Sequence, residues 1–407
     1  MPSETDVLII GGGLVGASLA CALGQAGVRT TVVEALPFAA DPQPGYDERS
    51  IALAQGSQRI FAGLGLWPAL EADACPIHTI HVSDRGHFGF TRLEREQEDV
   101  PALGYVATAR VLGQVLQDRL QQLETVDVLA PAQLTGFTIE ADAVQADIDY
   151  KGRSQHPTAA LLVAADGANS AIREQLGIQT QERDYRQTAV IANVSTDKPH
   201  NHIAYERFTD SGPLALLPMT EQRCALVWTV AADQSESLLA LDDATFLQRL
   251  QQRFGYRLGR FTRVGVRHAF PLQLLQAKES VRARLALAGN AMHTLHPIAG
   301  QGFNLGLRDV AALVDVILDA RRDGRDIGAL NILQRYAQWR QADQRRVALF
   351  TDSMVRLFGQ SLPPVVGLRD AGMLALDLCP PAKRWFGRMT MGRAGRLPRL
   401  ARGLSNG

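Results

Sequence analysis

The chain has 407 residues, which is more than a single hydrophobic core usually serves, so two or three domains are expected. Its 42 basic side chains balance 42 acidic ones, and a net charge of zero provides no overall field to attract nucleic acid. Four cysteines without CxxC or metal-ligand spacing, and the lack of any apolar stretch near the ~20 residues of a membrane span, predict a cytoplasmic protein with no disulfide framework and no metal site.

The first predicted unit begins with Val7–Ile10, a β-branched run typical of a buried parallel strand. The glycine loop Gly11–Gly16 follows, then a helix that ends at Gly27 and a second strand, 30–33. The first loop glycine permits a tight turn, the second lets backbone approach a diphosphate, and the third allows the helix to pack on the strand. The acid after the second strand would accept hydrogen bonds from ribose hydroxyls. This unit predicts dinucleotide binding, with FAD and NAD undecided, through Gly11, Gly13, Gly16 and Glu34.

A second motif joins the apolar strand at 161–165 to a short helix. The strand ends in Asp166-Gly167, and either Asn169 or Ser170 is a good N-cap for the helix. By itself this pattern also fits an ordinary strand–turn–helix joint, with Asp-Gly as turn chemistry.

A third motif follows the apolar strand at 285–288, which ends in Gly289-Asn290. An irregular loop then reaches Gly300–Gly302, and the segment from Phe303 to about 320 is apolar on most sides, which predicts a buried helix. The unpaired N–H groups at such a helix start would stabilise the negative charge of a reduced flavin.

In this order and spacing, the three motifs resemble those of the class A flavoprotein monooxygenases, the FAD-dependent aromatic hydroxylases, over nearly the whole chain. The resemblance implies an α/β fold, in which a Rossmann-like FAD-binding domain carries an inserted mixed or antiparallel β-sheet substrate domain and a C-terminal helical region. It assigns FAD contacts to Asp166 and to Asn290, which stands where the family usually has aspartate and whose side-chain oxygen can still accept a hydrogen bond. Arg49, in the segment 47–53, matches an arginine near the FAD diphosphate, and Arg110 is a second candidate, although surface salt bridges would also explain both. The third motif contributes Pro297, Gly300, Gln301, Gly302, Phe303 and Asn304.

The resemblance narrows to the ubiquinone-biosynthesis branch of that family. His296–Asp309 resembles the signature of this branch, as do segments 81–87, 189–194, 206–209 and 212–219. The implied reaction is hydroxylation of the aromatic ring of a polyprenylated methoxyphenol with NAD(P)H and O₂, through reduced FAD and a C4a-hydroperoxide. Only one strand–GxGxxG–helix unit occurs, so NAD(P)H is expected to bind transiently, as a co-substrate without a domain of its own.

No catalytic residue can be assigned from the sequence. His293 and His296 suggest a base for the phenol, but both also fit a role in holding the loop backbone. Two other functions stay open: a flavin oxidoreductase that does not insert oxygen, and a non-catalytic flavoprotein scaffold of the same pathway.

The domain organisation follows from these patterns. Period-two alternation from Thr188 to Val194 predicts antiparallel strands, which we expect to form a sheet over the flavin ring. We predict an FAD-binding domain of residues 1–76, 100–182 and 276–330, a β-sheet substrate domain of residues 77–99 and 183–275, and C-terminal helices with a basic tail at 331–407.

The basic tail has no acid beyond Asp377, and Pro398 argues against one continuous amphipathic helix. It fits either a solvated basic segment or a contact with other ubiquinone-biosynthesis proteins or with anionic lipid, peripheral on the inner face of the membrane.

Overall fold

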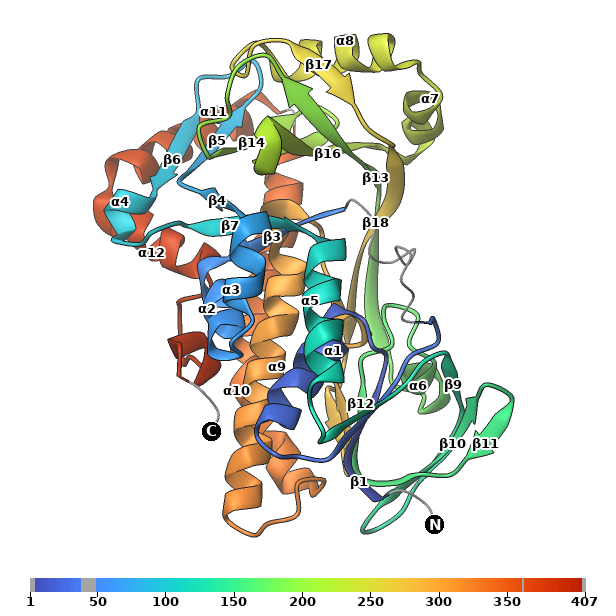
Figure 1. Ribbon diagram of the computed structural model, residues 1–407. Helices are drawn as coiled ribbons and strands as arrows, with labels where there is room; N and C mark the ends of the chain where they lie inside the picture. Colours follow the sequence, from blue (N-terminus) through green and yellow to red (C-terminus); the bar gives the residue numbers. More distant parts are fainter. Residues whose placement is uncertain (1–3, 38–48, 361, 405–407) are drawn as a thin grey trace.

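The structure is a computed structural model that describes residues 4–37, 49–360 and 362–404. Figure 1 shows one sheet at each end of the molecule, joined by two long strands and flanked by long helices. Within the described ranges, no helix has the length and apolar composition needed to cross a membrane.

The first sheet is built around β1 (Glu4–Ile10), which lies parallel between β2 (Thr30–Val33) and β12 (Thr158–Ala164). Val7 and Ile9 pack into the core formed with the helices, whereas Leu8 and Ile10 pack into a second core on the opposite face. Because both faces are covered, these strands are continuous apolar runs. The other strands of this sheet are β8 (Val126–Leu129), β9 (Ala132–Ile139), β10 (Val144–Tyr150), β11 (Arg153–Gln155), β19 (Val281–Arg282) and β20 (Leu285–Leu287).

Helices α1 (Leu14–Gln25), α5 (Ala109–Gln121) and α9 (Gln301–Arg322) share the core on the helical face of this sheet. The predictions of a helix before Gly27 and of a buried helix after the third motif are confirmed. Close by are the three-stranded sheet β3 (Ser50–Ala54), β7 (Gly104–Thr108) and β4 (Cys75–Ile77), helices α2 (Gln55–Gly63) and α3 (Trp67–Leu70), and the 3₁₀ turns η1 (Glu71–Asp73), η4 (Gly289–Ala291) and η5 (Ile298–Gly300). Helix α6 (Ala171–Gln175) packs on the opposite face of the first sheet, and α4 (Arg95–Glu98) contacts strand β6 (Phe90–Glu94) of the second large sheet.

The second large sheet confirms the predicted antiparallel region, with Val190, Ala192 and Val194 buried at period two on one face against α8 (Asp243–Phe254). The two connecting strands are β13 (Thr180–Thr196) and β18 (His268–Ala277). The predicted domain boundaries at 182/183 and 275/276 fall inside these strands, and the division stays a prediction. In spatial order the sheet runs β21 (His293–Thr294), β18, β13, β16 (Arg223–Ala231), β15 (Gly212–Pro218), β14 (Ile203–Thr209), β5 (Thr79–Asp84) and β6 (Phe90–Glu94). Strand β17 (Phe261–Val264) also pairs with β13. Helix α7 (Ser235–Leu239) and the 3₁₀ turns η2 (Thr220–Gln222) and η3 (Ala232–Gln234) lie in the connections between strands.

The C-terminal region packs against both sheets. Helix α10 (Leu330–Phe358) runs beside α9, as its apolar pattern predicts, and α11 (Pro363–Leu378) contacts β6. The basic tail is divided, as Pro398 predicts, into α12 (Pro380–Thr390) and the turn η6 (Leu400–Arg402).

Candidate active site

The glycine loop lies between β1 and α1, and its glycines meet different demands. Gly11 has φ +103°, and a Cβ on Gly16 would lie 1.9 Å from the carbonyl oxygen of Gly11, so the fold itself requires glycine at both positions. A Cβ on Gly13 would meet nothing within 4 Å. Neither packing nor backbone conformation explains the glycine at position 13, whereas the approach of a ligand to the loop would explain it.

Glu34 follows β2 and stands beside this loop. Its carboxylate accepts hydrogen bonds from the backbone N–H of Gly12 at 2.7 Å and of Leu36 at 2.9 Å. The strand order therefore brings the acid to the glycine loop, at the carboxyl ends of β1 and β2, where parallel α/β sheets bind dinucleotides.

The second motif ends β12 next to β1, and Ser170 caps α6 as predicted. Asp166 accepts a weak hydrogen bond from the N–H of Ile172 through Oδ2, while its Oδ1 is buried with no partner among the described groups. Arg173 carries a role that sequence reasoning missed. It donates to the carbonyl of Ala168 at 2.6 Å and to that of Ala291 at 2.9 Å, and so ties the second motif to the third. The signal in the sequence was an arginine at the end of the second motif, and its burial became visible only in the structure.

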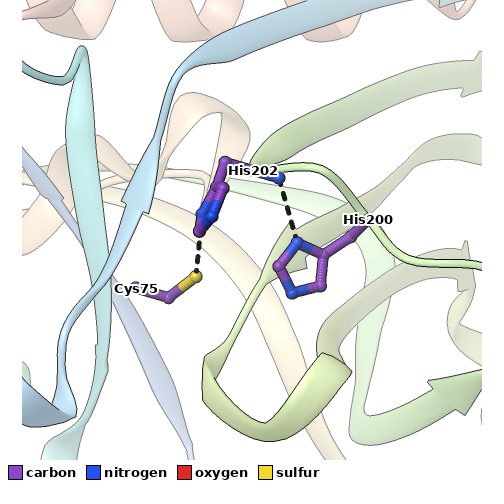
Figure 2. A group of neighbouring side chains, drawn as sticks. All are labelled: Cys75, His200 and His202. Atoms are coloured by element: carbon purple, nitrogen blue, oxygen red, sulfur yellow. Dashed lines mark hydrogen bonds between the residues drawn. The ribbon is translucent and has the colours of Figure 1, made fainter.

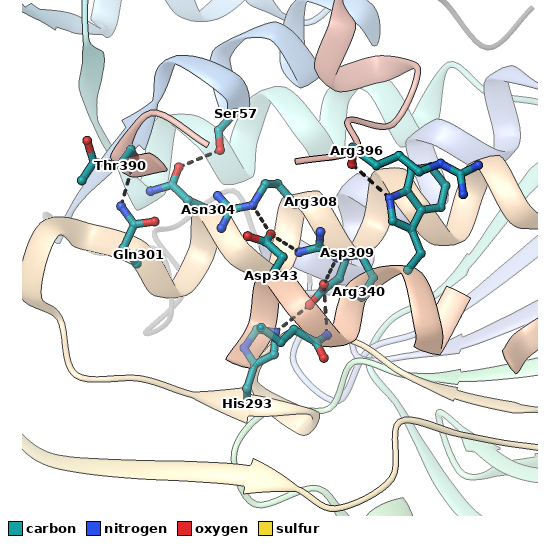
Figure 3. Close-up of polar contacts among 12 residues, drawn as sticks. Ser57, His293, Gln301, Asn304, Arg308, Asp309, Arg340, Asp343, Thr390 and Arg396 are labelled. Carbon is teal, nitrogen blue, oxygen red and sulfur yellow. Dashed lines mark hydrogen bonds and ion pairs between the residues drawn. The ribbon is translucent and has the colours of Figure 1, made fainter. Parts of the chain in front are cut away.

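The third motif is anchored by a buried ionic network (Figure 3). His293 Nε2 lies 2.6 Å from Asp309 Oδ2, and Arg340 Nε donates to Asp309 Oδ1 at 2.5 Å. Burial alone would raise the pKa of Asp309, but Arg340 and His293 lower it to about 2. His293 is therefore held by the protein, which matches the loop-holding alternative for this residue. Asn290, in the turn before it, is exposed.

The start of α9 presents backbone more than side chains. The amide of Asn304 is fully used, since it accepts from the N–H of Ala54 and from Ser57 and donates to the carbonyls of Ala52 and Gly300. A flavin could meet Asn304 only through its backbone.

The side chains of Gln301 and Phe303, which precede Asn304 in α9, also contact other parts of the protein. Gln301 donates to the carbonyl of Thr390 at 3.2 Å, and the ring of Phe303 lies 6.4 Å from that of Phe61. Gly300, which follows Pro297 by one turn, has φ +59° and closes onto Ala52. A Cβ on Gly302, by contrast, would meet nothing within 4 Å, so the helix start is open to a ligand.

These features fit FAD. The loop at Gly13 and the helix start at Gly302 both leave room for a ligand, and the buried Oδ1 of Asp166 lies in the second motif, where the family resemblance implies an FAD contact. The N–H groups of a helix of this length suit an anionic flavin ring.

Arg49 and Arg110 line a cavity of about 700 Å³ between β3, the start of α5 and the second large sheet. Arg49 also lies 5.4 Å above the ring of Phe270, and Arg110 is exposed. Residues 47 and 48 of the predicted arginine motif lie outside the described part of the chain. The cavity is basic, because Arg223 and Arg263 join its lining, and it suits a phosphate-bearing ligand. FAD contact by Arg49 and Arg110 stays a prediction.

A second cavity, of about 220 Å³, has a mostly apolar wall. It is enclosed by the face of the second large sheet that is turned away from α8, by β3 and the start of β7, by the loop of the third motif with the start of α9, and by helices α10 and α12. Its volume is below the ~300–1,000 Å³ of typical drug-sized sites and suits one substituted ring. Wall residues include Val82, Ala215 and Val227 from the sheet, His296 and Pro297 from the loop, and Phe350, Met354 and Phe386 from the helices.

His296 lies in this wall as a hydrogen-bond donor. Its Nδ1 accepts from the N–H of Ile298 at 3.3 Å, so the ring proton is on Nε2, which is buried without a partner in the described structure. Burial lowers the pKa of His296 to about 4. At neutral pH the His296 side chain is uncharged, and its Nε2, which already carries the ring proton, cannot accept another one.

Cys75, His200 and His202 form a separate cluster whose ligand atoms lie within 4.8 Å of one another (Figure 2). His200 uses both ring nitrogens, since Nδ1 accepts from the N–H of His202 at 3.1 Å and Nε2 donates to the carbonyl of Met219 at 3.0 Å. Burial raises the pKa of the Cys75 thiol to about 11, which keeps it protonated. In the described structure these three residues are joined to one another and to the neighbouring backbone by hydrogen bonds.

Comparison with known proteins agrees with this geometry. A family model described as FAD binding domain matches residues 4–351. Ubiquinone hydroxylase UbiL of Rhodospirillum rubrum is 40% identical over 402 residues, which cover 98% of this chain and 93% of that protein. The 3-demethoxyubiquinol 3-hydroxylase of Escherichia coli is 34% identical, with 93% and 96% covered. The crystal structure of p-nitrophenol 4-monooxygenase PnpA from Pseudomonas putida superimposes with a TM-score of 0.80 at 19% identity, covering 98% of this chain and 100% of that one, which confirms the predicted fold class.

Proposed function

The chain belongs to the FAD-binding monooxygenase family, in its ubiquinone hydroxylase branch, and from this premise we propose that it hydroxylates the ring of a polyprenylated methoxyphenol on the route to ubiquinone. The observation that carries the proposal is the apolar cavity of about 220 Å³, which is walled by the third motif at the start of α9. It offers a dry space for one aromatic ring beside the segment that suits the flavin.

The residues of the chain bind and position, while the redox chemistry belongs to the cofactor. Gly13, Glu34 and Asp166 would hold FAD together with the start of α9 at Gly302. When bound, FAD accepts hydride from NAD(P)H and activates O₂ for insertion into the ring. The apolar cavity wall excludes water, which would otherwise divert the activated oxygen to hydrogen peroxide.

The test uses purified protein loaded with FAD and supplied with NAD(P)H and O₂. Three polyprenylated phenols are tested in parallel: one with no methoxyl group, one with a single methoxyl group, and one with the substitution of demethoxyubiquinol. The products are identified by mass spectrometry. We expect one added oxygen on the ring of the monomethoxylated phenol, and fragmentation identifies the carbon. NAD(P)H consumption without oxygenated product for any phenol would favour the non-hydroxylating oxidoreductase, and a chain that does not retain FAD would favour the scaffold.

We also propose that the outer face of α12 rests on an anionic membrane surface. Phe386 of this helix lines the cavity, whereas Arg384, Trp385 and Arg388 are exposed on its other side, Trp385 at 62%. An aromatic side chain between cations is suited to a lipid interface. A cavity sized for one ring also requires the prenyl chain to leave the protein, and α12 is part of the wall that it would cross.

Vesicle flotation tests this surface. The wild-type protein is expected to float with vesicles of anionic phospholipid and not with vesicles of phosphatidylcholine, because each basic side chain near an anionic surface contributes ~1 kcal/mol. The double variant R384E/R388E should lose flotation, while R322E, which reverses an exposed arginine on α9, should keep it. If flotation is absent for the wild type, or unchanged in R384E/R388E, α12 is not a lipid contact and a protein partner becomes the better explanation.

A further inference from the structure

The cavity wall holds one feature that its apolar character does not explain. Among the described residues that line it, Glu206 carries the only acidic side chain. Glu206 lies in the middle of β14, where its neighbours across the sheet are Val82 on β5 and Ala215 on β15. Both of these residues also line the cavity, so the carboxylate belongs to the face that is turned to the cavity.

Among the described residues, no cation faces Glu206 to compensate its charge. Val82 and Ala215 flank it in the sheet, and the helical wall opposite is formed by Phe350, Met354 and Phe386. Desolvation by these surroundings raises the pKa of Glu206 to about 7. The side chain retains some exposure, but what it is exposed to is the cavity.

Two other titratable groups occur in the wall, and neither can act as a proton acceptor. His296 is neutral and presents its N–H. The ring of Tyr205 packs against His81 and Phe254 on the opposite face of the sheet from Glu206, and burial raises its pKa. An unpaired carboxylate in an apolar cavity is costly for the folded state unless a ligand supplies a hydrogen-bond donor.

We propose that Glu206 is the base that accepts the proton of the substrate's phenol hydroxyl. This rests on the proposed function, and it assigns a catalytic residue that the sequence left open. The O–H bond of the phenol breaks, its electron pair stays on the oxygen and delocalises into the ring, and the proton passes to a carboxylate oxygen of Glu206. A phenolate ring is more electron-rich than a phenol ring, and so reacts more readily with an electrophilic oxygen.

The first experiment measures binding and needs no turnover. FAD-loaded wild-type protein is titrated, by calorimetry, with a short-chain prenylated methoxyphenol and with its methyl ether, which has the same ring but no donor. We expect the phenol to bind at least tenfold more tightly than the ether, with a preference that grows as the pH rises through about 7, because the ionised carboxylate is a stronger hydrogen-bond acceptor than its protonated form and can take the proton. In E206L, which has no acceptor, the preference should be lost, and in E206Q, whose amide oxygen still accepts a hydrogen bond, it should no longer grow with pH. In E236Q, the same change at an exposed position on α7, the preference and its pH dependence should be kept.

The second experiment measures turnover. E206Q should keep its FAD, while hydroxylation falls about 10²–10⁴-fold, the range of general base catalysis, and its rate loses the rise with pH seen in the wild type. Equal binding of phenol and ether by the wild type, or a wild-type rate and pH profile in E206Q, would overturn the assignment. If the wild-type protein hydroxylates no phenol, the proposed function fails separately, and the binding comparison still decides whether Glu206 receives a phenol proton.

Discussion

Gly13 and Gly16 lie in one loop, but their surroundings in the protein differ. A Cβ on Gly16 would collide with the backbone of Gly11, whereas a Cβ on Gly13 meets no protein atom within 4 Å. The motif predicts different roles for these two glycines, and the structure is consistent with that division: a neighbouring backbone atom excludes a Cβ at position 16, and no protein atom excludes one at position 13.

This difference predicts opposite outcomes for two identical substitutions. G13A should leave the apoprotein's free energy of unfolding within about 0.5 kcal/mol of wild type and weaken FAD binding at least tenfold, because the new methyl group occupies the space of the diphosphate. G16A should destabilise the apoprotein itself by several kcal/mol, roughly the cost of overpacking. Urea unfolding of the apoproteins and FAD titration measure both quantities. Equal loss of stability in the two variants would contradict this account.

Glu206 couples the proposed chemistry to stability. Its folded pKa of about 7 exceeds its ordinary value of 4.5, so the native state holds this proton more tightly than the unfolded chain does. The stabilisation that comes from protonated Glu206 is therefore fully present below about pH 4.5, and it is lost as the pH rises through about 7.

E206Q removes this titration. We expect the variant and the wild type to unfold alike near about pH 5, and the variant to be more stable by up to roughly 3 kcal/mol near about pH 8, at about 1.4 kcal/mol per unit of pKa shift. Thermal unfolding of the FAD-loaded proteins across this range checks the sign. A wild type that is the more stable of the two at the higher pH would indicate an unrecognised partner for the carboxylate.

At the scale of elements, the ionic network around Asp309 connects α9, α10 and the loop of the third motif (Figure 3). Asp343 extends it, accepting from Arg340 at 2.7 Å and from Arg308 at 2.8 Å. Between η4 and η5 the chain forms the two-residue strand β21, which pairs with β18. The contact of His293 with Asp309 adds a side-chain anchor that ties this segment to α9 beside the cavity.

R340M should therefore destabilise the protein by about 3–5 kcal/mol, since it leaves Asp309 buried with its charge less compensated. The loss should shrink in strong acid, because the pKa of Asp309 is depressed from 3.8 to about 2 and its contribution, present above about pH 4, disappears as the pH falls through about 2. Urea unfolding at several pH values measures this, with R322M on the exposed side of α9 as control. A loss no larger than that of R322M would show that the network does not anchor the helices.

At the scale of the whole molecule, the second large sheet, the three-stranded sheet and the C-terminal helices help to enclose a cavity of about 220 Å³, which suits a ring better than a polyprenyl chain. Shortening the prenyl chain of the substrate should therefore change KM much more than kcat, because the chain contributes outside the reacting cavity. Steady-state kinetics with one to several prenyl units, in detergent and on vesicles, separate the two constants. A kcat that falls with each unit removed would place the chain inside the cavity.

The sequence alone was sufficient for the three motifs, the order of their strands and helices, and the family. These features depend on neighbours in the chain: the glycine at φ +103° in position 11, the Ser170 cap and the apolar runs of β1 and β12 are all local requirements that a residue pattern can express. The predicted C-terminal helices were confirmed for the same reason.

Only the tertiary structure decided what surrounds each side chain in the site. Alternation along β14 says that Glu206 and Tyr205 point to opposite faces of a sheet, but the docking of α10 and α12 determines which face becomes a cavity. Arg173 likewise gains its role from the carbonyl of Ala291, which is distant in the chain. Desolvation and long-range hydrogen bonds depend on which segments pack together, and a linear pattern does not contain that information.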